Sequence, residues 1–427
     1  MKKMMLVSLA AALGLHAATM GELFDALKNQ PQTELDAMQA RFARLGVQKA
    51  KESFYPTVSL FATYEHYSSP TNLRPMSPVE SAVMTQEHKP LPFANTIERL
   101  GAKATLPIFV KELFSLADKA EAMARSAKAK KRLNFLQNEA LLLGADASWR
   151  HLVALEAALQ ARMRSIEKTL ADTRVKVESG RAPGIALEKL DEGLNRLAIA
   201  LNDLRTKETS LEARIEALTG MRLDGPVPLR AKGDVEEGEI FALEPLKHQV
   251  EARRHAIAAA KGKLYPRVSA SAMWSENYGQ NAVSFNQAND DVHRGYGNYM
   301  VGLSMPLFAK GDYTGIEQAE VALRREQLRL ARTEQELSAQ AEALRKTLAL
   351  SGRSRELAAK SVANEKNLLA YAKVAYETGR MTEEEYLRYE EGLFEAQSKA
   401  AEADALWWQT LAQLAVIYGN DLRDIVE

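Results

Sequence analysis

The chain contains the stretch VESGRAPGIALEKLDEGL at residues 177–194 and a related stretch, YETGRMTEEEYLRYEEGL, at residues 376–393. Both carry Glu, then Ser or Thr, then Gly-Arg, and both end in Glu-Gly-Leu at the same internal distance. Each stretch lies between long charged segments with helical spacing. A catalytic site is seldom duplicated within one chain. The turn of a repeated structural unit, by contrast, occurs once in every copy of the unit.

The duplication extends far beyond these two stretches. Residues 107–220 align without a gap on residues 306–419, at a constant shift of 199. Upstream, AKESFYPTVSLFATY (50–64) matches AKGKLYPRVSASAMW (260–274) at a shift of 210. The sequence therefore predicts two copies of one unit, each with a helix, a strand, a loop, a strand, a very long helix, a turn and a returning helix.

The difference between the two shifts places 11 additional residues in the first copy. The Pro- and Ser-rich segment 68–94 is the expected position of this insertion, and its composition is typical of a loop. The polar, Asn-rich segment 277–295 is the corresponding loop of the second copy.

The predicted division of the chain follows from these repeats. It comprises a signal peptide (1–17), a first repeat (18–220), a connector (221–245) and a second repeat (246–427). Strands are expected at about 57–67, 96–106, 267–276 and 297–305, and helices at about 108–178, 184–219, 312–377 and 383–419.

The N-terminus, MKKMMLVSLAAALGLHAATM, has a basic start at Lys2 and Lys3, an apolar run and small residues after it. This order is typical of a secretory signal peptide. A short membrane anchor is the alternative, although the apolar run is too short to span a bilayer. We therefore expect the mature protein to leave the cytoplasm.

Composition excludes several classes of function. Lys plus Arg and Asp plus Glu are both 56, so the formal net charge is zero and no nucleic-acid partner is expected. Cysteine is absent, so there is no disulfide, no Cys nucleophile and no lipid attachment at a Cys. The seven His residues show no metal-ligand spacing, and no Walker loop or nucleophile elbow occurs, so we expect no metal, no cofactor and no enzyme activity.

The predicted strands alternate between apolar and polar residues. In the first, Val58, Leu60 and Ala62 alternate with polar residues, and Phe61 is the one large apolar residue on the polar side. Strands of about ten residues with one apolar and one polar face fit a water-filled transmembrane barrel. A soluble sheet with one buried face fits the same pattern, so the strands alone leave both possibilities open.

The helices show apolar residues at a sustained 3/4 spacing, which is the pattern of a coiled coil. An unbroken helix over 108–178 would be about 107 Å long, more than a compact domain requires. Four strands cannot close a barrel wide enough for water, so a barrel would need strands from several chains. We expect prolines to mark the corners between helices and strands, at Pro56, Pro107, Pro266 and Pro306.

The segments AKESFYPTVSL, AKGKLYPRVSA, LPIF and MPLF, with the two Gly-Arg turns, occur in an order that resembles TolC-family outer-membrane efflux proteins. The resemblance covers essentially all of the expected mature sequence. It implies a mainly α-helical fold with a small β part, in which four strands per chain complete a trimeric twelve-stranded barrel above an α-helical periplasmic tunnel. It also implies a periplasmic adaptor and an inner-membrane transporter of the RND or ABC type as partners.

In this family the turn between the long and returning helices forms the periplasmic entrance. By position, Tyr376 matches the family's gate tyrosine and Gly379 its turn glycine. The family's gate arginine falls at Met381, and its two constriction carboxylates fall at Glu385 and Arg388, the second with reversed charge.

The hypothesis from this comparison is a set of interchain ion pairs that closes the entrance. Its members are Arg380, Glu383, Glu384, Glu385 and Arg388. The alternative is a solvated helix N-terminus, because Thr382 followed by Glu385 is a capping box.

The two turns themselves are expected to dock on the adaptor. A left-handed glycine explains Gly180 and Gly379, and a helix start explains Pro183. No local rule requires Arg181 or Arg380, so these two are the candidates for contacts with a partner protein.

The sequence thus predicts a passive homotrimeric exit duct in the outer membrane of a Gram-negative bacterium, in contact with lipid and with most of its mass in the periplasm. A periplasmic coiled-coil adaptor or tether without a pore is the main alternative, and a secreted enzyme is a third.

Overall fold

The computed structural model describes residues 18–282 and 290–427. The expected signal peptide (1–17) and residues 283–289 of the second expected loop lie outside these ranges. The chain divides into two compact units. Unit 1 holds the residues up to Gln39, Lys128–Pro245 and Ala331–Glu427, and unit 2 holds Ala40–Ala127 and Leu246–Leu330.

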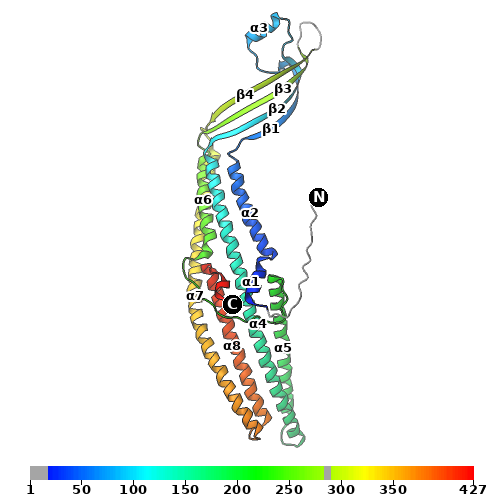
Figure 1. Ribbon diagram of the computed structural model, residues 1–427, viewed down its shortest axis with the longest axis vertical. Helices are drawn as coiled ribbons and strands as arrows, with labels where there is room; N and C mark the ends of the chain where they lie inside the picture. Colours follow the sequence, from blue (N-terminus) through cyan, green and yellow to red (C-terminus); the bar gives the residue numbers. More distant parts are fainter. Residues whose placement is uncertain (1–17, 283–289) are drawn as a thin grey trace. The chain divides into compact units, whose positions relative to one another are not determined.

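The predicted fold class is confirmed for the chain, which is mainly helical and has one four-stranded sheet. Figure 1 labels its strands and the helices α1 to α8. The helices are α1 (Met20–Lys28), α2 (Pro31–Glu52), α3 (Pro78–Gln86), α4 (Lys111–Glu178), α5 (Ile185–Thr219), the 3₁₀ turn η1 (Phe241–Leu243), α6 (Glu244–Gly262), α7 (Lys310–Glu377), α8 (Glu383–Tyr418) and α9 (Leu422–Ile425). The strands are β1 (Thr57–Asn72), β2 (Phe93–Val110), β3 (Arg267–Ala282) and β4 (Asp290–Ser304).

The two longest helices show the duplication directly. α4 and α7 each contain 68 residues, and both ends of α7 lie 199 positions after the ends of α4. At 1.5 Å per residue each helix is about 100 Å long.

The sheet of unit 2 is antiparallel throughout, with its strands in the chain order β1-β2-β3-β4. β1 and β4 therefore form its two edges. An edge strand carries a row of backbone N–H and C=O groups that can pair with another strand.

The register assigns the alternating residues to two faces. Leu60, Ala102 and Trp274 are opposite one another on the apolar face. Phe61, Gly101 and Ser275 are opposite one another on the polar face. A Cβ on Gly101 would lie 2.8 Å from the Phe61 ring, so the glycine gives room to this large side chain.

The apolar face is unusual in being open to solvent in the single chain. Leu60 is 83% exposed and Tyr299 92%, and Trp274, Val301 and Leu303 are also exposed. Apolar surface of this kind marks a site of contact with another molecule or with a membrane.

The strands are longer than expected, and both expected loops are correspondingly shorter. Segment 68–94 contains the end of β1, all of α3 and the start of β2. Segment 277–295 is strand at 277–282 and at 290–295, so expecting a loop over that whole segment was wrong. Its polar side chains suggested a loop, but a strand with one polar face accommodates them.

Three of the four prolines lie at the corners where they were expected. Pro56 and Pro266 directly precede β1 and β3, and Pro306 lies between β4 and α7. Pro107 was expected to end its strand, and this was wrong, because β2 continues to Val110. The ladder shifts register between Pro107 and Phe109, and such an irregularity accommodates a residue without an N–H.

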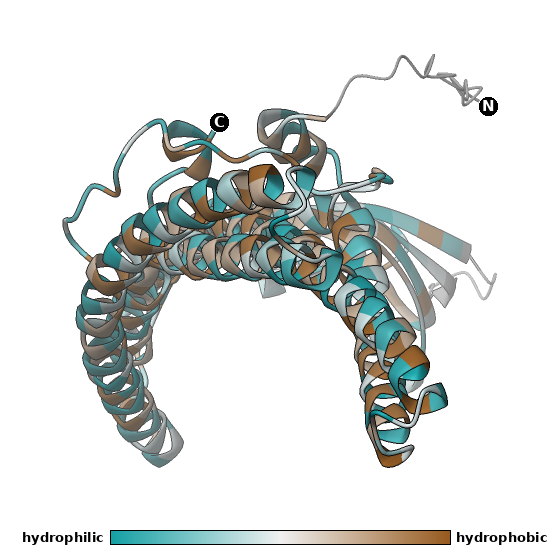
Figure 2. Ribbon diagram, turned by 90° about the horizontal axis from the view of Figure 1, so that it is seen from below, coloured by the Kyte–Doolittle hydropathy of each residue, from teal (hydrophilic) through white to brown (hydrophobic). Residues whose placement is uncertain are grey.

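In unit 1 the long helices form a single layer in the order α5, α4, α8, α7 (Figure 1). Arg205 of α5 donates to Glu156 of α4 at 2.9 and 3.0 Å. Asp404 of α8 lies between Arg150 of α4 (3.8 Å) and Arg355 of α7 (2.7 Å). Figure 2 shows hydrophobic residues on both sides of the long helices, interspersed with hydrophilic ones.

The main core of unit 1 forms where α1, α4, α8 and the C-terminal segment meet. Its fully buried members include Phe24, Leu142, Trp408 and Leu422. The acidic segment 221–245 contributes to this core, since Leu223 and Val227 are buried in it. A second anchor for this segment is Asp146 of α4, whose Oδ1 accepts the Val227 N–H at 2.8 Å.

Candidate functional site

The two Gly-Arg turns lie at the same end of unit 1, one between α4 and α5 and the other between α7 and α8 (Figure 1). We refer to them as the first tip (residues 179–184) and the second tip (residues 378–382). Both are built from the duplicated stretches of the sequence, and together they form the candidate site.

The two tips end their long helices with the same hydrogen bonds. Gly180 has φ = 70° and donates to the Val177 carbonyl at 2.9 Å, and Arg181 donates to the Lys176 carbonyl at 2.7 Å. In the second tip, Gly379 has φ = 71° and Arg380 donates to Ala375 at 2.8 Å. This is the Schellman motif, which requires a left-handed residue and so selects glycine.

The returning helices begin differently. α5 follows Pro183 and Gly184 and has no side-chain cap. α8 begins with a complete capping box, in which the Thr382 N–H donates to Glu385 Oε2 at 2.9 Å and the Glu385 N–H donates to Thr382 Oγ1 at 3.3 Å. The Thr382 hydroxyl also donates to Glu385 Oε2, at 3.0 Å, and the two hydrogen bonds that Thr382 donates hold the pKa of Glu385 below its ordinary value.

Ion pairs connect the start of α8 to the end of α4. Lys168 Nζ lies 2.8 Å from Glu383 Oε2, Arg164 lies 3.5 Å from Glu390, and Arg162 lies 3.6 Å from Glu391. We call these three pairs the α4–α8 ladder. It places basic residues on α4 against acidic residues on α8 and so favours close approach of the two helices.

The Lys168–Glu383 pair lies nearest the second tip. The hydrogen bond and charge of Glu383 raise the pKa of Lys168 above its ordinary value. Nearby, the rings of Tyr376 on α7 and Tyr386 on α8 stack with centroids 5.3 Å apart, which joins the two helices of the second hairpin.

The structure gives each carboxylate of the expected interchain latch a partner within the chain. Glu383 pairs with Lys168, Glu385 caps its own helix, and Glu384 accepts from Arg388 at 2.6 Å. Arg380 is exposed, and its side chain makes no ion pair with any residue in the described ranges. The interchain latch itself stays a prediction, since a single chain contains only one side of it.

Arg181 of the first tip is likewise exposed, with no side-chain partner among residues 18–282 and 290–427. Gly180 and Pro183 are exposed beside it. Both tips therefore present an arginine to solvent, as the proposed contact with a partner protein requires.

The sequence reasoning missed the basic side of the ladder. Arg164 and Lys168 are four residues apart and so share one side of a helix, whereas Arg162 does not, and all three lie more than 200 residues before their partners. The acidic cluster of α8 was the available signal. What sequence alone did not supply was the lateral order of the helices, which places α4 beside α8.

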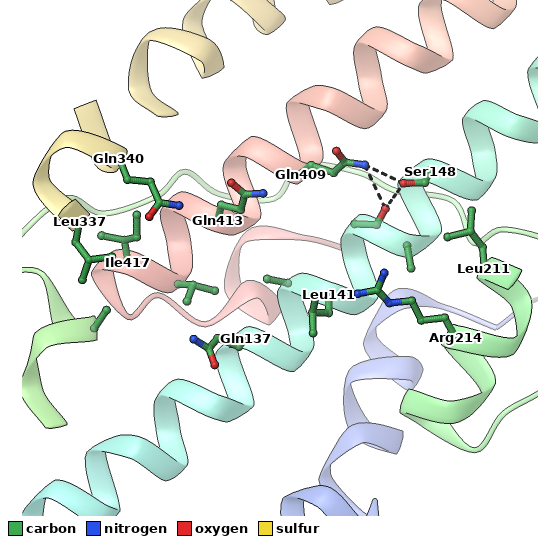
Figure 3. A pocket seen from close by; sticks show the side chains of 15 residues that line it. Gln137, Leu141, Ser148, Leu211, Arg214, Leu337, Gln340, Gln409, Gln413 and Ile417 are labelled. Carbon is green, nitrogen blue, oxygen red and sulfur yellow. Dashed lines mark hydrogen bonds between the residues drawn. The ribbon is translucent and has the colours of Figure 1, made fainter. Parts of the chain in front are cut away.

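A hollow of about 520 Å³ lies on the helical layer of unit 1, among α4, α5, α7 and α8 (Figure 3). Gln137, Gln340, Gln409 and Gln413 line it together with apolar residues. Gln409 donates to Ser148 Oγ at 2.8 Å. The lining is mostly apolar, and its polar groups are the four glutamines, Ser148 and one charged side chain, Arg214.

Among residues 18–282 and 290–427, no His, Cys, Asp and Glu side chains group in a way that could hold a metal ion. No helix in the same ranges has both the length and the apolar character needed to cross a membrane.

Comparison with known proteins finds a family likeness within the second repeat. Residues 241–420 match the family model described as outer membrane efflux protein. No curated protein matches the chain.

Solved structures extend the likeness to nearly the whole chain. A membrane protein from Pseudomonas aeruginosa is 15% identical with a TM-score of 0.71, over 93% of this chain and 93% of that one. The outer membrane protein VceC from Vibrio cholerae is 15% identical with a TM-score of 0.70, over 94% and 96%. The CmeC outer membrane channel of Campylobacter jejuni is 14% identical with a TM-score of 0.69, over 95% and 85%. The resemblance to TolC-family outer-membrane efflux proteins is therefore confirmed, by the family match in the second repeat and by the fold of the whole.

Proposed function

We propose that this protein is a passive exit duct of the outer membrane, through which an efflux system releases its substrates. The observation that carries the proposal is the sheet of unit 2. It has one apolar and one polar face, and it ends in two open edges, β1 and β4. An open edge is not tolerated in lipid, so such a sheet must be completed by other chains.

A homotrimer satisfies this requirement. Four strands from each of three chains would make a twelve-stranded barrel, with the exposed apolar face toward lipid and the polar face toward water. The single helical layer of unit 1 fits the same assembly. α7 forms one edge of that layer and carries exposed apolar residues, including Leu350, Leu357 and Tyr371, which suit contact with a neighbouring chain.

The two tips would face the periplasm and receive an adaptor that is served by an inner-membrane transporter of the RND or ABC type. The exposed Arg181 and Arg380 are suited to carbonyl and carboxylate groups of that adaptor. Energy would come from the transporter, because the duct has no catalytic role in this proposal. Most of the mass would lie in the periplasm of a Gram-negative cell.

We further propose that the second tip is the gate. The α4–α8 ladder holds the start of α8 against α4 within one chain. Glu384, Glu385, Arg380 and Arg388 are placed around the same turn, where they can also meet a neighbouring chain. Opening the entrance would require α8 to move and at least the pair nearest the tip, Lys168–Glu383, to separate.

The test is expression of the full chain in a Gram-negative host, followed by fractionation and native mass determination in detergent. We expect the protein in the outer-membrane fraction, extractable only with detergent, at three times the mass of one chain. Recovery as a soluble monomer or dimer in the periplasmic fraction would contradict the duct and favour the alternative, a coiled-coil adaptor or tether without a pore.

A further inference from the structure

The connection between β1 and β2, residues 73–92, is an ordered segment that we call the strap. Its two ends are joined, because the Leu73 N–H donates to the Pro92 carbonyl at 2.9 Å. Between them lies α3, which Ser77 caps by accepting the Glu80 N–H at 3.2 Å. Arg74 forms an ion pair with Glu80, so the strap has internal structure of its own.

Two side chains of the sheet hold the strap by its backbone. Arg99 of β2 donates to the Leu73 carbonyl at 2.7 Å, and Asn277 of β3 donates to the same carbonyl at 2.9 Å. Arg99 and Asn277 are direct neighbours in the register of β2 and β3, so the carbonyl is held above a single point of the sheet. The Arg99 Nε in turn donates to Glu65 of β1 at 3.2 Å, which fixes the guanidinium.

The Leu73 side chain is buried in the same place. It has 0% exposure and packs with Ala94, Ile97 and Val292. A Cβ at Gly279 would lie only 2.8 Å from Leu73 Cδ1, so this glycine makes room for the leucine. The strap is therefore packed against the sheet as well as hydrogen-bonded to it.

The register identifies the face that the strap covers. Arg99 lies two residues from Gly101 and Asn277 lies two from Ser275, so both share the polar face of the sheet with Phe61. β1 begins next to Pro56 at one end of the sheet, and the strap lies at the other end. The strap thus lies on the face that points to water in the proposed barrel.

We infer that the strap, held by Arg99 and Asn277, crosses the outer mouth of the channel and limits the size of the molecules that leave. The inference rests on the proposed function, since it assigns the polar face to the lumen. In a trimer the strap would occur three times around one opening, and the narrowest point would depend on all three copies. Pore diameter and the groups that line it set which solutes pass.

The test compares channels of the wild type with those of Arg99→Ala/Asn277→Ala. We expect the double variant to raise single-channel conductance by about twofold and to pass larger neutral sugars in a liposome-swelling assay. The matched control is Lys103→Ala, which removes an exposed cation from the same face of β2 without touching the strap. It should behave as the wild type.

An independent measurement follows the strap itself. The chain has no cysteine, so Val83→Cys places a single spin label on α3, at a position 45% exposed. The label should be ordered in the wild-type trimer and markedly more mobile in the double variant. If the double variant does not form trimers, replacement of residues 78–86 by a flexible Gly-Ser linker leaves the hydrogen bonds of Arg99 and Asn277 to the Leu73 carbonyl in place and should raise the conductance in the same way.

The outcomes separate the two proposals. A wild type that forms no channels overturns the proposed function, and the strap with it. Wild-type channels whose conductance and sugar cut-off are unchanged when the label becomes mobile, or when α3 is replaced, overturn the strap alone.

Discussion

Glu139 of α4 is a carboxyl group with only 1% of its surface exposed, and its Oε2 has no hydrogen-bond partner among the described residues. Burial raises its pKa to about 8, and the neighbouring Asp421 carboxylate acts in the same direction, against the Leu422 N–H and the charge of Lys28. Asp421 caps α9, so a protonated Glu139 joins α4 to the C-terminal segment.

The sign of the pH dependence follows from this shift. The folded-state pKa lies above the ordinary value, so the favourable contribution is complete below about pH 4.5 and is lost as the pH rises toward 8. Glu139→Gln keeps the shape and an N–H donor, and it should raise the free energy of unfolding at pH 9 by on the order of 2–4 kcal/mol but change it little at pH 5. Thermal unfolding across this pH range measures the effect.

The control for this prediction is Glu167→Gln, an exposed carboxylate on the same helix. Its melting temperature should follow the wild type at every pH. A difference between Glu139→Gln and the wild type that does not grow with pH would contradict the assignment.

Lys168 and Glu383 allow a charge-swap test of the gate. Both are partly exposed, so their pair contributes little to folding and should hardly affect unfolding, yet a small contribution at this position is enough to shift the balance between a closed and an open entrance. Lys168→Glu should therefore increase the fraction of time that channels spend open in bilayers, and the double variant Lys168→Glu/Glu383→Lys should restore closure. A double variant as open as the single one would show that the pair does not hold the gate.

At the scale of elements, the two tips are the part of the structure that could best be predicted. Gly180 and Gly379 follow from a turn that must be left-handed, and local sterics alone select glycine there. The strand ends were less predictable. Polar residues near Asn277 suit a loop and the polar face of a strand equally, and only pairing with β2 and β4 decides between them.

The ion pairs between different helices could not be predicted from the sequence for a similar reason. The capping box of Thr382 and Glu385 is local and could be predicted, whereas the ladder depends on α8 lying beside α4. Spacing within one helix identifies a charged side but not the helix that it faces.

Gly379→Ala tests the tip as an element. The residue has φ = 71° with open space around it, so the cost is backbone strain of about 1 kcal/mol, and not a clash. Hydrogen exchange should become faster in residues 374–384, while distant helices are unaffected. Gly193→Ala is the matched control, because Gly193 lies inside α5 with open space around it and alanine there should stabilise the helix by about 0.5–1 kcal/mol. Unchanged exchange at the second tip would contradict a strained left-handed turn.

At the scale of the whole molecule, both units leave surfaces uncovered in the single chain. The sheet of unit 2 has two open edges and an exposed apolar face, and the long helices of unit 1 form one layer instead of a bundle. The duplication of the sequence accounts for the number of these elements. The two sequence repeats together supply two helical hairpins and four strands, and the surfaces that stay uncovered are suited to further copies of the same chain.

The most direct test of the central claim is the electrical conductance of the purified, detergent-extracted protein in planar lipid bilayers. The duct predicts discrete, uniform current steps carried by the trimer. Bilayers that stay silent, or that show only irregular leakage, while the protein remains folded would contradict it.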